Sequence, residues 1–230
     1  NPRLYKQTIS LDPNIKIDIL KIFFKKYVLR LHIYVFKSIL YMRGSEIPML
    51  LQFKVKNFQS IKDEAILSMV PSADRSHPEN LAQEGNREAI KTAAIYGANA
   101  AGKSAVIRAF VAAIMAVRTS DTRNITQKIP GMVPFKFDEE TAKAPCSFEF
   151  FFVANDGIPY RYGFTADSDR VQEEYLYFYT SARPSRVFER TGDDFDFNQA
   201  SKSTFSEYEE KNTSNKFFLA TATNWGNAKT

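Results

Sequence analysis

The stretch Gly97-Ala98-Asn99-Ala100-Ala101-Gly102-Lys103-Ser104 decides how this chain is interpreted. It satisfies the pattern G-x-x-x-x-G-K-[ST], in which a loop of small residues cradles a polyphosphate with its backbone N–H groups. The apolar run at 93–96 before it predicts a strand, and the stretch at 105–117 after it predicts a helix. A strand, such a loop and a helix in succession predict a nucleotide-binding site. We call residues 97–104 the P-loop.

Each residue type in the P-loop has a chemical reason to be there. The two glycines allow the backbone to turn its amides inward around several negative charges, at the positive start of a helix. We expect Lys103 to reach the β- and γ-phosphates as a mobile charge and the Ser104 hydroxyl to ligate Mg²⁺. The competing interpretation is an ordinary glycine-containing turn with Lys103 in solvent.

The helix expected at 105–117 is apolar nearly all round, and only Arg108 inside it is charged. This pattern suits a helix that packs against a sheet and is covered on its other side. The uncharged stretch between Arg108 and Arg118 is about half of the ~20 residues that a membrane span requires.

Length and composition favour a globular protein with one domain or two small ones, because 44% of the 230 residues are hydrophobic. Cys146 is the only cysteine, which excludes an intramolecular disulfide and a cysteine-based zinc site and favours a reducing cytoplasm. The two histidines, His32 and His77, are expected at the surface or in loops and not as metal ligands.

Residues 1–48 carry much of the excess positive charge, with lysines and arginines interleaved among apolar residues. Such a segment can be an amphipathic helix that binds an anionic membrane or nucleic acid. We favour the alternative that this basic extension is not part of the working domain, because the recognisable pattern starts near Met49. No cleavable signal peptide is evident, since lysines interrupt the apolar run.

The segments on either side of the P-loop predict mainly strands and connections. Alternation at 51–55 and the run at 65–70 predict an antiparallel hairpin, whereas 71–92 and 119–134 are expected to be loops. An antiparallel meander is expected over 147–197, with strands at 147–153, 160–164, 171–179, 186–190 and 195–197. Its aromatic residues are interpreted as core and cross-strand pairs; the alternative is a stacking platform for nucleic-acid bases.

Together these motifs resemble the amino-terminal half of the AAA15-type ATPases, which are prokaryotic relatives of the overcoming-lysogenization-defect, RecF and SMC heads of the ABC ATPase class. The resemblance rests on Asn57-Phe58-Gln59-Ser60-Ile61 at a strand end, on the P-loop, and on Pro134-Phe135-Lys136-Phe137-Asp138 before a tyrosine-rich meander, and it covers residues 49–230. It implies ATP and Mg²⁺ as cofactors, a head that forms a homodimer around nucleotide, and a role in phage defence or DNA transactions, often beside a nuclease or toxin partner.

The chain departs from that family pattern in two motifs. We find no Ser-Gly-Gly signature and no run of four apolar residues followed by Asp-Glu. Asp156 only mimics the second motif and is interpreted as a turn residue, and Asn224 is the closest amide to an expected glutamine but receives no role. We therefore expect a truncated head that binds ATP and hydrolyses it poorly alone, with the catalytic residues unassigned and the second motif beyond Thr230.

The expected fold class is α/β: the P-loop strand and helix in a mainly parallel core of ABC-ATPase-head type, with an antiparallel β-subdomain from 50–70 and 147–197. The expected domains are the extension at 1–48 and the partial head at 49–230. The leading function is an ATPase whose nucleotide-driven dimerisation switches a partner. The alternatives are a RecF- or SMC-like ATPase of DNA repair or chromosome maintenance, a nucleotide-regulated DNA-binding module, and a P-loop kinase or GTPase, which the lack of an Asn-Lys-x-Asp motif disfavours.

Overall fold

The computed structural model describes residues 49–99, 101–154 and 156–227, with side chains as far as Asn224. The basic extension at 1–48 and Ala100 of the P-loop lie outside the described residues. In chain order the elements are β1 (Met49–Lys56), β2 (Ala65–Ser68), η1 (Pro78–Asn80), β3 (Leu81–Glu84), β4 (Arg87–Ile90), α2 (Lys103–Arg118), α3 (Glu139–Lys143), β5 (Cys146–Val153), β6 (Pro159–Ala166), β7 (Val171–Phe178), β8 (Ser185–Thr191), β9 (Asp194–Phe197), α4 (Lys202–Glu209) and α5 (Phe218–Asn227).

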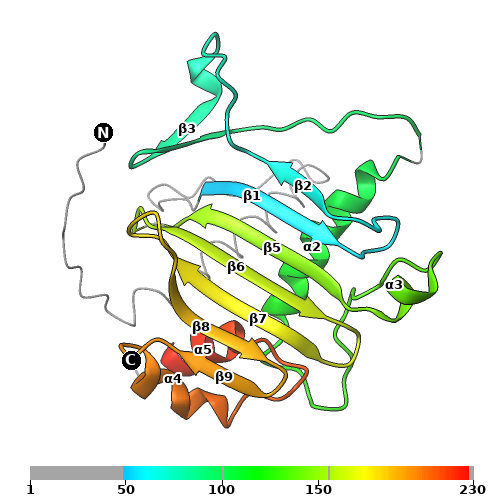
Figure 1. Cartoon of the computed structure of the whole chain (residues 1–230), viewed down its shortest axis with the longest axis vertical. Helices are drawn as coiled ribbons and strands as arrows, with labels where there is room; N and C mark the ends of the chain where they lie inside the picture. The colour runs from blue at the N-terminus through cyan, green and yellow to red at the C-terminus, as the bar shows by residue number, and fades with distance from the viewer. Residues whose placement is uncertain (1–48, 100, 155, 228–230) are drawn as a thin grey trace, which may run out of the picture.

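A seven-stranded sheet in the order β2-β1-β5-β6-β7-β8-β9 forms the centre of the molecule (Figure 1). Every neighbouring pair in it is antiparallel, so the predicted hairpin and the predicted meander are both confirmed. The two join into one sheet because β1 lies between β2 and β5, where Phe53 is opposite Leu67 on one side and Phe150 on the other.

The predicted parallel core is wrong for the described residues, in which both sheets are antiparallel throughout. The run at 93–96 is not a strand: it adopts no regular structure, and the side chain of Tyr96 is 90% exposed. Apolar character alone does not make this run a strand, because a strand needs a neighbouring strand that pairs with its backbone hydrogen-bonding groups. The described residues include no such neighbour for this run.

The predicted loop at 71–92 was also wrong in part. It contains the short helix η1 and the two-stranded sheet β3–β4, in which Leu81 is opposite Ile90 and Glu84 opposite Arg87. Gly85 forms the turn with a φ of 58°, a left-handed conformation that suits glycine. The sequence did not predict this hairpin because its residues are mostly polar, and only Ala89 among them is buried.

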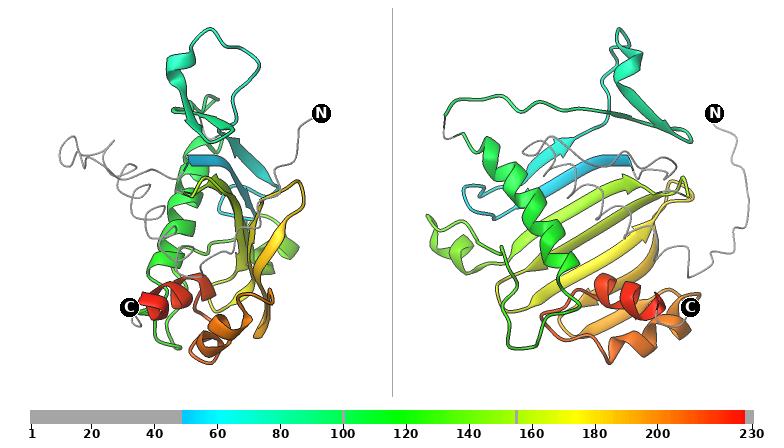
Figure 2. Two further views of the ribbon diagram at one scale, coloured as in Figure 1. Left: turned by 90° about the vertical axis from the view of Figure 1, so that its left-hand side faces the viewer. Right: turned by 180° about the vertical axis from the view of Figure 1, so that it is seen from behind.

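The predicted helix is confirmed as α2, and it lies diagonally across one face of the large sheet (Figure 2). Alanines on its inner side allow a close approach to the sheet, and Phe110 meets Phe53 edge-on with ring centroids 5.1 Å apart. The strands supply the other side of the core with aromatic rings, which confirms the interpretation of these aromatics as core residues: Phe148, Phe150, Phe152, Tyr160, Tyr162 and Phe164.

The outer side of α2 is less covered than its sequence predicted. Ile107 is 42% and Met115 is 38% exposed, although the inner residues Ala109 and Ala113 are fully buried. Nothing in the described part of the chain forms a second layer over these two side chains. Among the described residues, no helix combines the length and the apolar character that crossing a bilayer requires.

Candidate functional site

The P-loop leads directly into the first turn of α2. Gly102 is the N-cap residue, with a φ of 84°, and the helix begins at Lys103. No side chain caps this helix start, and its first turn contains no acidic residue. The first N–H groups of a helix have no partner within the helix, so they and the helix dipole favour an anion at this place.

Lys103 folds back over the loop that precedes it. Its ammonium donates hydrogen bonds to the carbonyl oxygens of Gly97, at 2.8 Å, and Ala98, at 2.5 Å. A lysine has three N–H donors, so one remains beyond these two. These bonds hold the P-loop curled around the ammonium, which is the arrangement that brings positive charge to the helix start.

The P-loop is accessible where the structure describes it. Gly97, Ala98, Asn99 and Ala101 are exposed, and so is Ser104 in the first turn of α2. A Cβ on Gly102 would meet no atom closer than the Ser60 hydroxyl, at 3.8 Å, so the glycine is required by its positive φ and not by lack of space. An anionic ligand can therefore reach both the loop backbone and the Ser104 hydroxyl.

A turn at residues 57–62, between β1 and β2, lies beside the P-loop. Besides the Ser60 approach to Gly102, Gln59 accepts a hydrogen bond from Arg108 of α2, between Oε1 and Nε at 2.8 Å. Arg108 is itself exposed, and the sequence interpretation gave this turn no place beside the P-loop. Its Asn-Phe-Gln-Ser signature was visible, but the pairing of residues more than forty positions apart was not.

Two residues of the 57–62 turn have left-handed backbones that are uncommon outside glycine, namely Asn57 with a φ of 55° and Gln59 with a φ of 50°. Surrounding contacts hold this conformation. The buried Asn57 amide donates to the carbonyl oxygens of Thr141, Ala144 and Pro145 and accepts from the Phe135 N–H at 3.0 Å. Asn57 thus holds the segments on both sides of α3 against the 57–62 turn.

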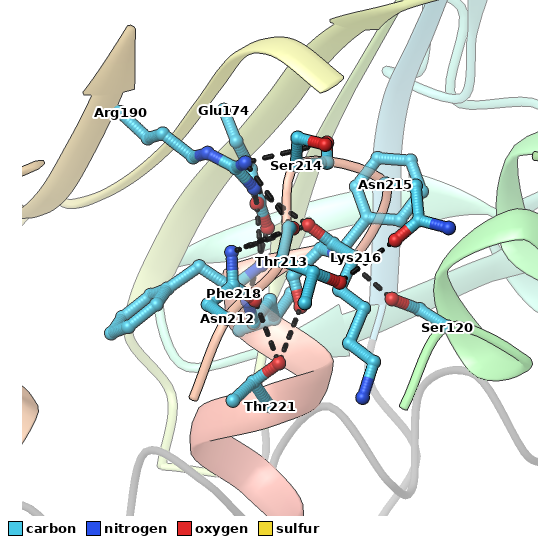
Figure 3. Close-up of polar contacts among 12 residues, drawn as sticks. Ser120, Glu174, Arg190, Asn212, Thr213, Ser214, Asn215, Lys216, Phe218 and Thr221 are labelled. Carbon is cyan, nitrogen blue, oxygen red and sulfur yellow. Dashed lines mark hydrogen bonds and ion pairs between the residues drawn. The ribbon is translucent and has the colours of Figure 1, made fainter. Parts of the chain in front are cut away.

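A second polar cluster surrounds Glu174 of β7, beside the loop that leads into α5 (Figure 3). Its carboxylate is fully buried and accepts from the Tyr162 hydroxyl at 2.9 Å, from the Phe218 N–H at 2.6 Å and from the Leu219 N–H at 3.0 Å. The last two are the first amides of α5, so Glu174 caps that helix. Burial raises the pKa of Glu174, whereas Arg190 and these hydrogen bonds oppose the increase.

Arg190 of β8 lies beside this carboxylate, with Nη1 4.0 Å from Oε2 of Glu174. Its guanidinium also donates to the carbonyl oxygens of Gly192, at 2.7 Å, and Lys216, at 2.6 Å. Burial lowers the pKa of Arg190, and Glu174 counteracts that decrease. The pair therefore holds the start of α5 and the loop before it against β7 and β8.

The same loop is fastened to the far end of α2. The Ser120 hydroxyl accepts from the Phe217 N–H at 2.6 Å, and Arg123 donates to the carbonyl oxygens of Asn215 and Ala116. The end of α2, the sheet and the start of α5 are consequently one connected unit, whose other end presents the P-loop.

The remaining sequence-predicted residues lie away from the P-loop. Asp156 is confirmed as a turn residue, since its carboxylate accepts from the Ile158 N–H and the Tyr160 hydroxyl. His77 is exposed and contacts Glu79, whereas Cys146 is buried, which raises its thiol pKa to about 12. Asn224 is exposed on α5. Among the described residues, no group of three or more His, Cys, Asp or Glu side chains is placed to hold a metal ion.

The fold and the motif define a mixed α/β protein with a P-loop sequence at the start of a helix that packs on an antiparallel sheet. Residues 93–229 match the family model described as "AAA domain, putative AbiEii toxin, Type IV TA system". Because this match spans more than half of the chain, the chain belongs to that family of P-loop ATPase-type domains. Comparisons with curated proteins and with solved structures gave no match.

Proposed function

We propose that this protein binds ATP together with Mg²⁺ at residues 97–104. The observation that carries the proposal is the helix start itself: α2 begins without a side-chain cap and without an acid, and Lys103 lies over the loop that leads into it. Membership of a P-loop ATPase-type family supports the same ligand. A polyphosphate would replace the missing cap with its own oxygens.

The residues of the P-loop fit these two cofactors. The exposed loop amides and the Lys103 ammonium would bind the phosphates, and the exposed Ser104 hydroxyl offers the hard oxygen ligand that Mg²⁺ prefers. When bound, the magnesium ion would neutralise phosphate charge; the protein's part is to orient the phosphates against the start of α2.

We further propose that the domain is an AAA15-type head of the ABC-like class, which dimerises around nucleotide and switches a nuclease or toxin partner. Support comes from the antiparallel sheet that joins β1 and β2 to the meander, as expected for the β-subdomain of such a head. The family description, with its putative AbiEii toxin and Type IV TA system, supports a role in toxin–antitoxin or abortive-infection systems.

Isothermal titration with ATP and Mg²⁺ tests the binding proposal. We expect Lys103→Ala to abolish measurable binding and Ser104→Ala to weaken the dependence of ATP affinity on Mg²⁺. Lys202→Ala, on an exposed residue of α4, is the matched control and should bind like the parent protein. If Lys103→Ala keeps the parent affinity while its thermal unfolding is unchanged, the assignment of the P-loop is wrong.

A further inference from the structure

Phe137 lies almost wholly in solvent, with 92% of its surface exposed. Among the residues with described side chains this is unusual for a phenylalanine, because most of the others are buried in the core. Phe135 stands behind it, with the two ring centroids 5.7 Å apart in an edge-on arrangement. An aromatic ring supported by another ring and left open on its outer side is a surface on which a planar group can stack.

The backbone around Phe137 is fixed by the 57–62 turn. The Gln59 N–H donates to the Val133 carbonyl at 2.8 Å, and the Phe135 N–H donates to the Asn57 side chain at 3.0 Å. On the other side, the Lys62 ammonium pairs with the Asp138 carboxylate at 2.9 Å. Phe137 is thus exposed on a segment that is anchored before and after it.

The same turn contacts the P-loop and its helix, through Ser60 beside Gly102 and through Gln59 bonded to Arg108. Figures 1 and 2 place the start of α2, this turn and the segment before α3 at one end of the sheet. The aromatic segment and the phosphate-binding loop are therefore two neighbours of a single, conformationally restricted turn. This juxtaposition places an open ring and a site for polyphosphate next to the same turn.

We propose that Phe137, supported by Phe135, stacks against the base of the nucleotide whose phosphates bind at 97–104. This inference rests on the proposed function and adds the part of the site that recognises the base. Bases stack on aromatic side chains through their π-faces, and a purine offers more area than a pyrimidine. The ligand class is therefore a purine nucleoside triphosphate.

The test compares ligands with and without a base on the full chain. Affinities for ATP, CTP and inorganic tripolyphosphate, each with Mg²⁺, are measured by isothermal titration for the parent protein, Phe137→Ala and Phe137→Trp. Tyr96→Ala is the matched control, because Tyr96 is an equally exposed aromatic residue next to Gly97. Since Phe137 is exposed, its replacement should leave the melting temperature unchanged.

We expect Phe137→Ala to weaken ATP binding about tenfold, a value within the range of single base–aromatic contacts. Tripolyphosphate affinity should stay unchanged, the preference for ATP over CTP should shrink, and Phe137→Trp should restore ATP binding. Three results would overturn the inference: unchanged ATP affinity in Phe137→Ala, an equal loss for ATP and tripolyphosphate, or a loss in Tyr96→Ala alone. Failure of the parent protein to bind either ligand, or unchanged binding in Lys103→Ala, would instead refute the P-loop proposal.

Discussion

Replacing Glu174 with alanine is expected to destabilise the protein by about 3–5 kcal/mol, the usual effect of removing one partner of a buried charge pair. The side chain is fully buried, and its loss would remove the carboxylate that accepts from the Tyr162 hydroxyl and from the Phe218 and Leu219 amides. Each unsatisfied buried donor alone costs about 1–3 kcal/mol, although such values do not add. Arg190 would keep its carbonyl acceptors but lose the carboxylate 4.0 Å away.

Guanidinium chloride unfolding, followed by far-ultraviolet circular dichroism, measures this cost. The midpoint should fall strongly while the slope stays constant, since the surface exposed on unfolding hardly changes. Glu174→Gln, which keeps the size and one acceptor oxygen, should cost less, about 2 kcal/mol.

Glu173→Ala is the matched control, because this residue precedes Glu174 on β7 but is exposed on the opposite face of the sheet. Its effect should remain within about 0.5 kcal/mol. A loss below about 1 kcal/mol in Glu174→Ala would refute the reasoning, because the carboxylate would then be dispensable for α5 and for the charge of Arg190.

Two further predictions concern other contacts. In Gly163→Ala the new Cβ would overlap the Tyr175 hydroxyl, which donates to Glu149 at 2.6 Å. We therefore expect the free energy of unfolding, measured with denaturant, to fall by about 1–3 kcal/mol. An unchanged midpoint would contradict this. The hydrogen bond from Lys62 lowers the pKa of Asp138 from its usual 3.8 to about 2. The stabilisation from this pair is therefore present above pH 3.8 and is lost as the pH falls towards 2. A carboxyl titration by nuclear magnetic resonance should find this low pKa and its return towards 3.8 in Lys62→Ala; the same value in both proteins would show that Lys62 is not the cause.

Local sequence patterns predicted the helices and strands that are set by the residues of the segment itself. Alternation identified β1 and the strands of the meander, and the apolar run after the P-loop identified α2. The strand expected at 93–96 was wrong because a strand depends on a partner, and β3 and β4 were missed because their residues are mostly exposed. The same holds for the site. Lys103 and Ser104 were visible in a motif, whereas Gln59, Ser60 and Phe137 entered only the family resemblance and received no role in the site.

By itself, the sequence determined that a glycine-rich loop with Lys103 and Ser104 precedes an apolar helix, because eight consecutive residues carry that information. Only the tertiary structure decided that the sheet beneath the helix is antiparallel and that the 57–62 turn lies between the P-loop and Phe137. It also decided that Glu174 binds the start of α5 and Arg190 the loop before it. The physical reason is distance along the chain. Contacts between residues tens of positions apart form when buried faces of helices and strands pack together. The periodicity of a single segment does not indicate which other segment it will contact.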